Sequence, residues 1–175
     1  PKCKEIIAEL ESKGSTDENL LAAGRASFIA GDYASSTRLA DSVLERQPDN
    51  LVSLLLAADT ATRLAVQTED DAHYERAVDL YSRILAKDPA NLAAANNLAW
   101  TLGINLGKEH RAMEEILRRV PAAAQASPTV PVDILDTLGT LHMRMNQLDK
   151  ARTYFDAIIQ RDPDNATAYF RVGQI

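Results

Sequence analysis

The sequence is poor in several features that would assign a class of protein at once. It holds one cysteine, Cys3, which cannot form an internal disulfide, and aromatic residues make up only 5% of it. No apolar run approaches the roughly 18 residues that a membrane-spanning helix requires. Basic residues number 19 against 25 acidic ones, which gives a net charge of −6. The composition therefore predicts no membrane span, and it disfavours nucleic acid as a partner, because nucleic-acid binding needs clustered Lys and Arg.

Residues with catalytic or metal-binding chemistry are also sparse. His73, His110 and His142 are far apart and show no metal-ligand spacing. The string "DPDN" lacks the glycine and distal glutamate of a calcium loop, and "GINLGK" lacks the spacing of a phosphate-binding loop. We therefore predict no catalytic residue, no cofactor and no metal site, and we expect a protein that is not an enzyme.

An internal repeat dominates what is present. The strings "RQPDN", "KDPAN" and "RDPDN" end at Asn50, Asn91 and Asn165, and each lies between two apolar helical patterns. Their prolines lie 41 residues apart (89 − 48) and 74 apart (163 − 89). A unit of about 34 residues fits the first interval once with seven extra residues, and the second twice with six extra. Each string predicts a helix stop followed by a new N-cap, at Asp164 or Asn165 in the last copy.

The clearest copy of the repeat covers residues 132–165 and predicts two helices joined by a short polar turn. Gly139 lies inside the first of these helices, where glycine costs about 1 kcal/mol relative to alanine. We therefore expect a neighbouring helix to approach closely at Gly139, with Ala151 as the small residue that faces it. Apolar residues recur at helical spacing at Leu135, Leu138, Leu141 and Met145 in one pattern and at Leu148, Ala151, Phe155, Ile158 and Ile159 in the other.

This copy resembles the tetratricopeptide repeat family. The family pattern is W-x2-L-G-x2-Y, then alanine, an aromatic residue and proline. The matching residues are Leu138, Gly139, Ala151, Phe155 and Pro163, with Leu135 in place of the tryptophan and His142 in place of the tyrosine. Earlier copies depart from the pattern, with Ser36 in place of the alanine and Ala57-Ala58 in place of Leu-Gly. The resemblance implies an all-α fold, a right-handed α-solenoid of antiparallel helix pairs.

The repeat phase divides the chain into about four units and the first helix of a fifth. We interpret the extra residues as tolerated loop insertions, because the entropy of closing a loop grows slowly with its length. Alternatively, the acidic cluster at Glu69–Asp71 contacts a partner, or the proline-rich join is a hinge. We expect a fragment of a longer array, with caps at its two ends as the alternative. The predicted segments are an N-terminal helix at 1–16, repeats at 17–50, 51–91 with an inserted loop near 66–73, 92–131 with a long Pro/Ala-rich join and 132–165, and a last helix at 166–175.

The resemblance also implies where a partner binds. In the family, the first helices of successive units line a concave groove, and ligand contacts come from the helix face away from the packed Leu-Gly stripe. Carried over by repeat phase, the predicted groove residues are Arg25, Phe28, Leu55, Asp59, Arg63, Asn96, Asn97, Trp100, Asp136, Thr140, Met143, Arg144 and Arg171.

Two of these positions have competing interpretations. Asn97 occupies a place where family members often hydrogen-bond the backbone of an extended peptide, but it could equally cap or bridge to the next helix. Trp100 is either a groove anchor or part of the core of its unit. The two-carboxylate clamp of the chaperone-binding members needs cations, and Asp133, Asp136 and Thr137 occupy part of their place. We therefore expect that clamp to be absent.

The predicted function is a non-catalytic scaffold that binds a peptide or a partner protein in the groove. One alternative is a regulatory or targeting domain of a larger enzyme, or of an envelope or secretion assembly protein. Another is self-association into a homo-oligomer through the terminal helices. The sequence assigns no compartment.

Overall fold

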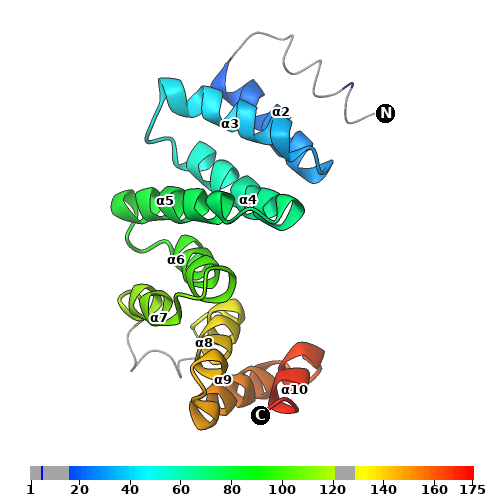
Figure 1. Ribbon diagram of the computed structural model, residues 1–175, viewed down its shortest axis with the longest axis vertical. Coiled ribbons are helices and arrows are strands. Elements are labelled where there is room, and N and C mark those ends of the chain that lie inside the picture. The colour runs from blue at the N-terminus through cyan, green and yellow to red at the C-terminus, as the bar shows by residue number, and fades with distance from the viewer. Residues whose placement is uncertain (1–4, 6–15, 121–128) are drawn as a thin grey trace. The chain divides into compact units, whose positions relative to one another are not determined.

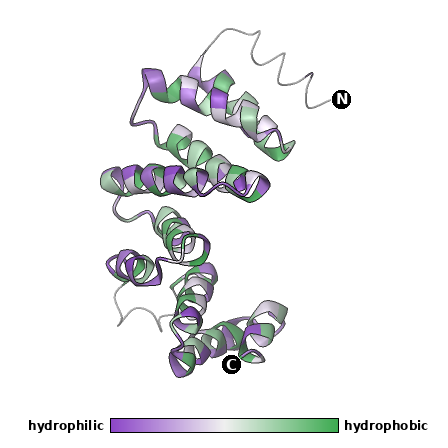
Figure 2. Cartoon of the chain, in the orientation of Figure 1, coloured by the Kyte–Doolittle hydropathy of each residue, from purple (hydrophilic) through white to green (hydrophobic). Residues whose placement is uncertain are grey.

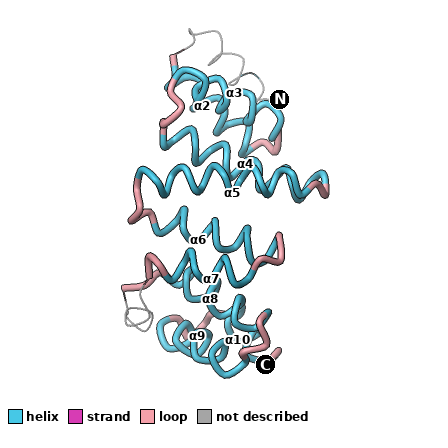
Figure 3. The backbone as a smooth tube through the Cα atoms, turned by 60° about the vertical axis from the view of Figure 1, so that its left-hand side comes forward, coloured by secondary structure: helices cyan, strands magenta, loops and turns pink. Residues whose placement is uncertain are grey.

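The structure is a computed structural model that describes Glu5 and residues 16–120 and 129–175. Every regular element in those ranges is a helix, as Figures 1 and 3 show. The predicted helix at 1–16 lies almost wholly outside the described residues, as does the 121–128 part of the Pro/Ala-rich join. The chain forms two compact units, and the boundary between them falls between Ala94 and Ala95. Each unit is described by itself.

The first unit consists of two helix pairs in its described part. α2 packs against α3 and α4 packs against α5, while α3 joins the pairs by packing against α4 (Figure 1). α2 also contacts α4, so the first helices of the two pairs are neighbours. In Figure 2 many hydrophilic residues lie along α5, whose charged side faces away from the buried stripe. The bounds are α2 Asp17–Ile29, α3 Tyr33–Arg46, α4 Leu51–Thr68 and α5 Asp71–Lys87.

The second unit is helical throughout its described part and contains a π-helical segment, η1. α7 packs against η1 and α8, and α9 packs against α8 and α10. α6 begins three residues before the unit boundary and runs directly into η1. The bounds are α6 Leu92–Trp100, η1 Thr101–Asn105, α7 Glu109–Leu117, α8 Val132–Arg144, α9 Leu148–Arg161 and α10 Ala166–Val172.

Small residues let the two helices of a pair approach each other. A Cβ placed on Gly139 would lie 2.7 Å from Cζ of Phe155, a residue that is fully buried on α9. The predicted close approach at Gly139 is therefore made by the Phe155 ring. The corresponding small residues of the four pairs are all buried: Gly24 and Ser36, Ala58 and Ala77, Ala99 and Ala112, Gly139 and Ala151.

Ser36, which stands where the family pattern has alanine, is satisfied inside the first unit. Its hydroxyl lies 2.9 Å from the hydroxyl of Thr60, and both residues are buried. Thr60 donates its own hydrogen to the carbonyl of Leu56 at 2.6 Å, so Ser36 donates to Thr60. A buried hydroxyl without a partner would cost about 1–3 kcal/mol, and this pairing avoids that cost.

The recurring asparagines tie the end of one helix to the start of the next. The side-chain oxygen of Asn165 accepts from the backbone N–H of Ala168 at 3.0 Å, so Asn165 is the N-cap of α10. Its amide nitrogen donates to Asp162, the C-cap of α9, at 3.0 Å. Asn50 and Asn91 make the same pair of bonds with Gln47 and Ser53 and with Asp88 and Ala94. One side chain thus satisfies a free amide and fixes the turn.

The seven extra residues of the second repeat lengthen its helices. Most of the predicted loop at 66–73 is helical, because α4 continues to Thr68 and α5 begins at Asp71. α4 has 18 residues against 13 in α2, and α5 has 17 against 14 in α3. Only Glu69, in the left-handed region at φ 54°, and Asp70, which caps α5, form the connection. Helical hydrogen bonds satisfy the added backbone, whereas a longer loop would leave it to water.

One extra residue distinguishes the third repeat, and η1 accommodates it. The small residues Ala99 and Ala112 are 13 positions apart, against 12 for Gly139 and Ala151. After α6 the backbone N–H of Leu106 donates to the carbonyl of Thr101, five residues back. Such a π-turn holds one more residue than an α-turn over the same rise.

Candidate functional site

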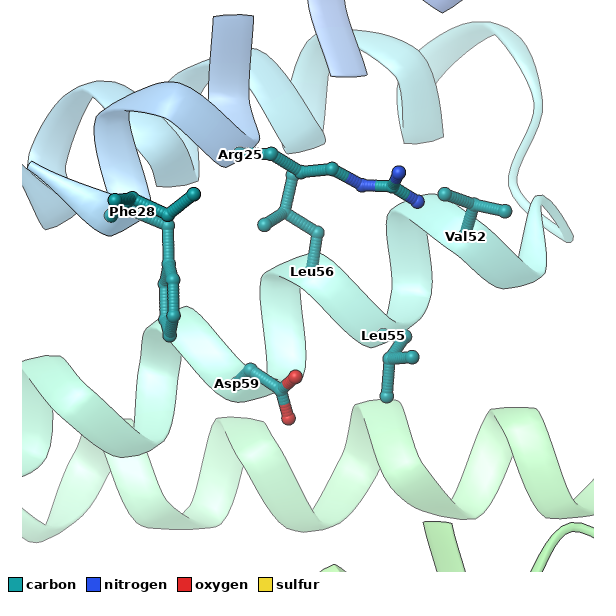
Figure 4. A pocket seen from close by; sticks show the side chains of 7 residues that line it. Arg25, Phe28, Val52, Leu55, Leu56 and Asp59 are labelled. Carbon is teal, nitrogen blue, oxygen red and sulfur yellow. The ribbon is translucent and has the colours of Figure 1, made fainter. Parts of the chain in front are cut away.

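A hollow opens on the first unit between α2 and α4 (Figure 4). Its volume is about 230 Å³. The two helices come close here because Gly24 has no side chain: a Cβ at that position would lie 2.9 Å from Cδ2 of Leu56. Leu56 is 8% exposed and forms the floor. The lining residues are Arg25, Phe28, Ile29, Val52, Leu55, Leu56 and Asp59.

Exposed apolar side chains form most of the rim. Ile29 is 82% exposed, Val52 43% and Leu55 40%. Phe28 is half-buried, and its ring packs against that of Tyr33 at a centroid distance of 5.6 Å. In Figure 4 Phe28 descends from α2 on one side, and Val52 and Leu55 extend from α4 on the other, Val52 at its upper edge and Leu55 below it. A surface of this kind gains free energy when an apolar group covers it.

Two charged residues border this apolar surface, and they differ in whether another described side chain bonds them. The carboxylate of Asp59 accepts a hydrogen bond from the hydroxyl of Tyr81 on α5 at 2.7 Å. The guanidinium of Arg25 makes no hydrogen bond or ion pair with any described residue. Figure 4 shows it extended along the rim toward Val52, away from Asp59. Within the described part of the first unit Arg25 therefore presents an available cation, whereas Asp59 also holds the second helix of its pair.

Two further hollows adjoin the first and share residues with it. One, of about 440 Å³, is lined by Asp17, Glu18, Leu21, Ala22, Arg25, Asn50 and Val52. The other, of about 180 Å³, is lined by Arg25, Leu51, Val52, Leu55, Ile84 and Asn91. Arg25 and Val52 line all three hollows, and we call the surface that carries these three hollows the α2–α4 groove.

The structure brings together four residues that the repeat phase predicts for the groove of the first unit. Arg25, Phe28, Leu55 and Asp59 line one hollow. Arg63 is exposed on α4, one turn beyond Asp59. These positions follow from helical phase, because residues three and four apart share a face of a helix.

Two predicted groove residues of the second unit are buried with unsatisfied polar atoms. Asn96 is 8% exposed, and its side-chain oxygen has no hydrogen-bond partner in the described part of the chain. Thr140 is 6% exposed, and its hydroxyl likewise has none there. Both lie deeper than the prediction of groove contacts requires.

Predicted charges of the second unit interact with other charged side chains. Asp136 on α8 is half-buried, and burial raises the pKa of its carboxyl group, while the positive charge of Arg171 opposes that rise. Arg144 donates from Nε to Glu109 on α7 at 2.9 Å, and this bond lowers the pKa of Glu109. Arg144 is therefore engaged within its own unit. Met143, also on α8, is half-buried.

Asn97 and Trp100 lie at the end of α6, where the π-turn begins. Asn97 is half-buried, and its backbone carbonyl accepts from the hydroxyl of Thr101 at 2.7 Å. Trp100 is half-buried and is the last residue of α6. The peptide contact of Asn97 and the anchoring role of Trp100 remain predictions.

Sequence reasoning missed Ile29 and Val52 in the groove of the first unit. Val52 lies three residues before Leu55 on the same face of α4, so helical phase alone could have found it. Ile29 is the last residue of α2, where the face of a helix is poorly defined by periodicity.

Within residues 16–120 and 129–175, no cluster of His, Cys, Asp or Glu is arranged to hold a metal ion. None of the helices described there is long and apolar enough to cross a membrane.

Comparison with known proteins assigns the family. The sequence model described as tetratricopeptide repeat matches residues 132–175. The TPR repeat-containing protein PA4667 of Pseudomonas aeruginosa is 30% identical over 125 residues, which are 71% of this chain and 19% of that protein. The chain belongs to the tetratricopeptide repeat (TPR) family. It spans less than one fifth of the length of this TPR relative.

Solved TPR structures share the fold. TTC0263 of Thermus thermophilus is 18% identical with a TM-score of 0.70, over 91% of this chain and 80% of that one. YrrB, described as a TPR protein with an unusual peptide-binding site, is 17% identical with a TM-score of 0.68, over 95% and 79%. These likenesses confirm the predicted all-α solenoid of helix pairs. TPR proteins are generally non-catalytic scaffolds that bind protein partners.

Proposed function

We propose that this TPR chain is a non-catalytic scaffold and that its α2–α4 groove holds a peptide segment of a partner protein. The observation that carries the proposal is the convergence of Arg25, Phe28, Leu55 and Asp59 on one hollow. An apolar rim with a few placed polar groups is typical of ligand sites, since the apolar part supplies affinity and the polar part orientation. The peptide-binding site ascribed to YrrB, a protein of the same fold, supports a peptide as the ligand.

The second unit is proposed to contribute contacts of its own. Asn97 and Trp100 at the end of α6, and Asp136 and Arg171 with their opposite charges, offer polar and aromatic groups to a peptide. An amide such as that of Asn97 both donates and accepts, which suits a peptide unit. Asn97→Ala and Trp100→Ala should each weaken peptide binding, which fluorescence polarisation with a selected peptide measures.

The groove of the first unit is tested by one pair of matched variants. A phage-displayed library of nine-residue random peptides is selected on the chain, and the selected peptides are titrated by fluorescence polarisation. Leu55→Asp places a charge on the rim and should weaken binding about tenfold or more, because it removes apolar contact area. Leu148→Asp is the control, since Leu148 is 37% exposed on α9, outside the groove.

The proposal predicts that only Leu55→Asp affects the titration, with both variants melting at the temperature of the parent. Equal affinities for the parent and Leu55→Asp would show that the peptides bind elsewhere. A library that yields no binder would contradict peptide recognition itself.

Self-association is a second candidate, favoured by the exposed aromatic residues of α10. Tyr169 is 52% exposed and Phe170 65%. Large exposed side chains side by side are typical of contact surfaces. Sedimentation velocity over a hundredfold range of concentration should then show a dimer that Phe170→Glu abolishes, and a monomer at every concentration would contradict this candidate.

A further inference from the structure

We propose that the α2–α4 groove selects a partner segment in which an Asp or Glu side chain lies two residues from a large apolar side chain. This inference rests on the proposed function, because it specifies the peptide that the same groove holds. It assigns the apolar side chain to the rim formed by Phe28, Val52 and Leu55, and the carboxylate to Arg25.

Arg25 is the residue that imposes an anionic group on the ligand. It lines all three adjoining hollows, so a peptide seated in any of them meets its side chain. It is exposed and has no ion-pair or hydrogen-bond partner among the described residues. A guanidinium matches a carboxylate geometrically, through parallel N–H···O bonds.

The neighbouring acidic residues of the chain do not pair with Arg25, so the ligand is proposed to supply the carboxylate. Asp59 is held by the hydroxyl of Tyr81 at 2.7 Å. Asp17 is paired with Arg46 at 2.7 Å. Glu18 lines only one of the three hollows, whereas Arg25 lines all of them. No acidic residue in the described part of the chain is paired with Arg25, and an incoming carboxylate supplies that counter-charge.

The charge pattern favours a protein carboxylate over a polyanion. Within the described part of the first unit, Arg25 is the only cation that lines these three hollows. Nucleic acid and anionic membranes are bound by clusters of Lys and Arg. The chain as a whole carries a net charge of −6, which repels both. A single carboxylate matches a single guanidinium.

The spacing of the two ligand groups follows from the spacing of the groove residues. Arg25 and Phe28 are three residues apart on α2, which separates their Cα atoms by about 4.5 Å along the helix axis. The guanidinium of Arg25 lies further from Phe28, because the side chain extends toward Val52 (Figure 4). In an extended peptide, side chains two residues apart lie on the same side, about 6.8 Å apart. Side chains that are adjacent in sequence point to opposite sides. The order is therefore an acidic residue, any residue, then a large apolar residue, or the reverse.

The experiment compares the peptides selected by three forms of the chain. The library of nine-residue peptides is selected in parallel on the parent, on Arg25→Glu and on Arg111→Glu. The last is the matched control, because Arg111 is an exposed arginine of α7 in the other unit. Peptides from the parent and the control should be enriched in Asp or Glu two positions from Leu, Ile or Phe.

Arg25→Glu should lose the acidic preference and keep the apolar one. A peptide selected on the parent should bind this variant about tenfold more weakly. Replacing its acidic residue by lysine should restore binding to Arg25→Glu and weaken binding to the parent. This charge swap isolates the interaction between Arg25 and the acidic residue of the peptide. Either change alone removes that ion pair, and the two changes together form a new one with reversed charges.

Three outcomes separate this inference from the proposed function. Peptides that depend on Leu55 but show no acidic preference overturn the inference and leave the proposed function standing. An acidic preference that survives Arg25→Glu also overturns the inference. If no peptide is selected, or if Leu55→Asp changes nothing, both the groove as a peptide site and the inference are overturned.

Discussion

The second repeat accommodates its extra residues in longer α-helices, whereas the third accommodates one extra residue in a π-helical segment. The second holds seven more residues than the family unit of about 34, and it places them in longer α4 and α5 helices. The third has one extra residue between Ala99 and Ala112, and it forms the π-helical segment η1. The left-handed residue that ends the first helix shows the shift, since Gly107 lies eight positions after Ala99 and Asn146 lies seven after Gly139.

Helical geometry explains the difference. Seven residues are close to two turns of 3.6 residues each, so the small residues Ala58 and Ala77 both stay buried after the insertion. One residue turns a helix by about 100°, which would move a buried face into solvent. A π-turn takes up that residue locally and keeps Ala99 and Ala112 fully buried.

The strongest test of this comparison removes one residue from the long pair. Deleting Val66 leaves six extra residues, which are not a whole number of turns, so α5 must rotate or its two-residue connection must shorten. We expect a loss of about 3 kcal/mol in the free energy of unfolding, at the upper end for a one-residue change. Urea denaturation followed by circular dichroism measures it. An unchanged midpoint would show that helical register does not govern this pair.

A smaller effect is expected where a side chain replaces the contact glycine of the fourth repeat. Gly139→Leu places atoms where the ring of Phe155 lies, and overpacking of this kind costs about 1–3 kcal/mol. Gly173→Leu is the control, because a Cβ there would meet only backbone oxygens at 3.5 Å. The melting temperature should fall for Gly139→Leu alone. Equal melting of both variants would contradict the close helix contact.

Deleting Asn105 should be nearly neutral and would sharpen the comparison. The deletion restores the 12-residue spacing of Gly139 and Ala151 and lets η1 become α-helical. It also removes a buried side-chain oxygen that has no hydrogen-bond partner in the described part of the protein. We expect a change of less than about 1 kcal/mol, because the two effects oppose the loss of local contacts. A loss as large as that from deleting Val66 would show that the π-turn is needed for stability.

The smallest effect is a pH dependence centred on His142. Burial lowers the pKa of this histidine, although its Nδ1 lies 2.8 Å from the side-chain oxygen of Gln147. The neutral form is therefore favoured in the folded protein. Stability from this group is fully present above the unfolded pKa of about 6.5 and is lost as the pH falls below it toward the folded pKa.

Thermal melts of the parent between pH 7.5 and 5.5 should show this loss, and melts of His142→Phe should show less of it. Phenylalanine keeps a flat ring in the place where His142 stacks on Tyr154 at 5.4 Å. Identical pH profiles would assign the dependence to other groups.

Most of the helical architecture was predictable because its signals are local. The asparagines after each proline predicted N-caps, and Asn165 makes that bond. Periodicity predicted paired helices, and Gly139 predicted a close contact. The fate of the extra residues near 66–73 was not predictable in this way, because polar residues such as those at 67–71 suit a loop and a helix end equally.

The residues of the candidate site were predictable only where helical phase alone determines which side chains share a face. Arg25, Phe28, Leu55 and Asp59 share a hollow as the repeat phase predicts. Phase could not show that Asp59 bonds Tyr81, because that contact joins two residues that are 22 positions apart and lie on different helices. It could not show the burial of Asn96 and Thr140 either, since burial depends on which neighbouring side chains cover a position.

The sequence by itself determined the family, the helix pairs and their caps, because each depends on residues within about one repeat of one another. Only the tertiary structure decided where the helices come close enough to leave a hollow, which charges are already satisfied, and how the third repeat absorbs one residue. Those properties depend on contacts between helices, where a difference of one ångström or one rotamer separates an available group from an engaged one.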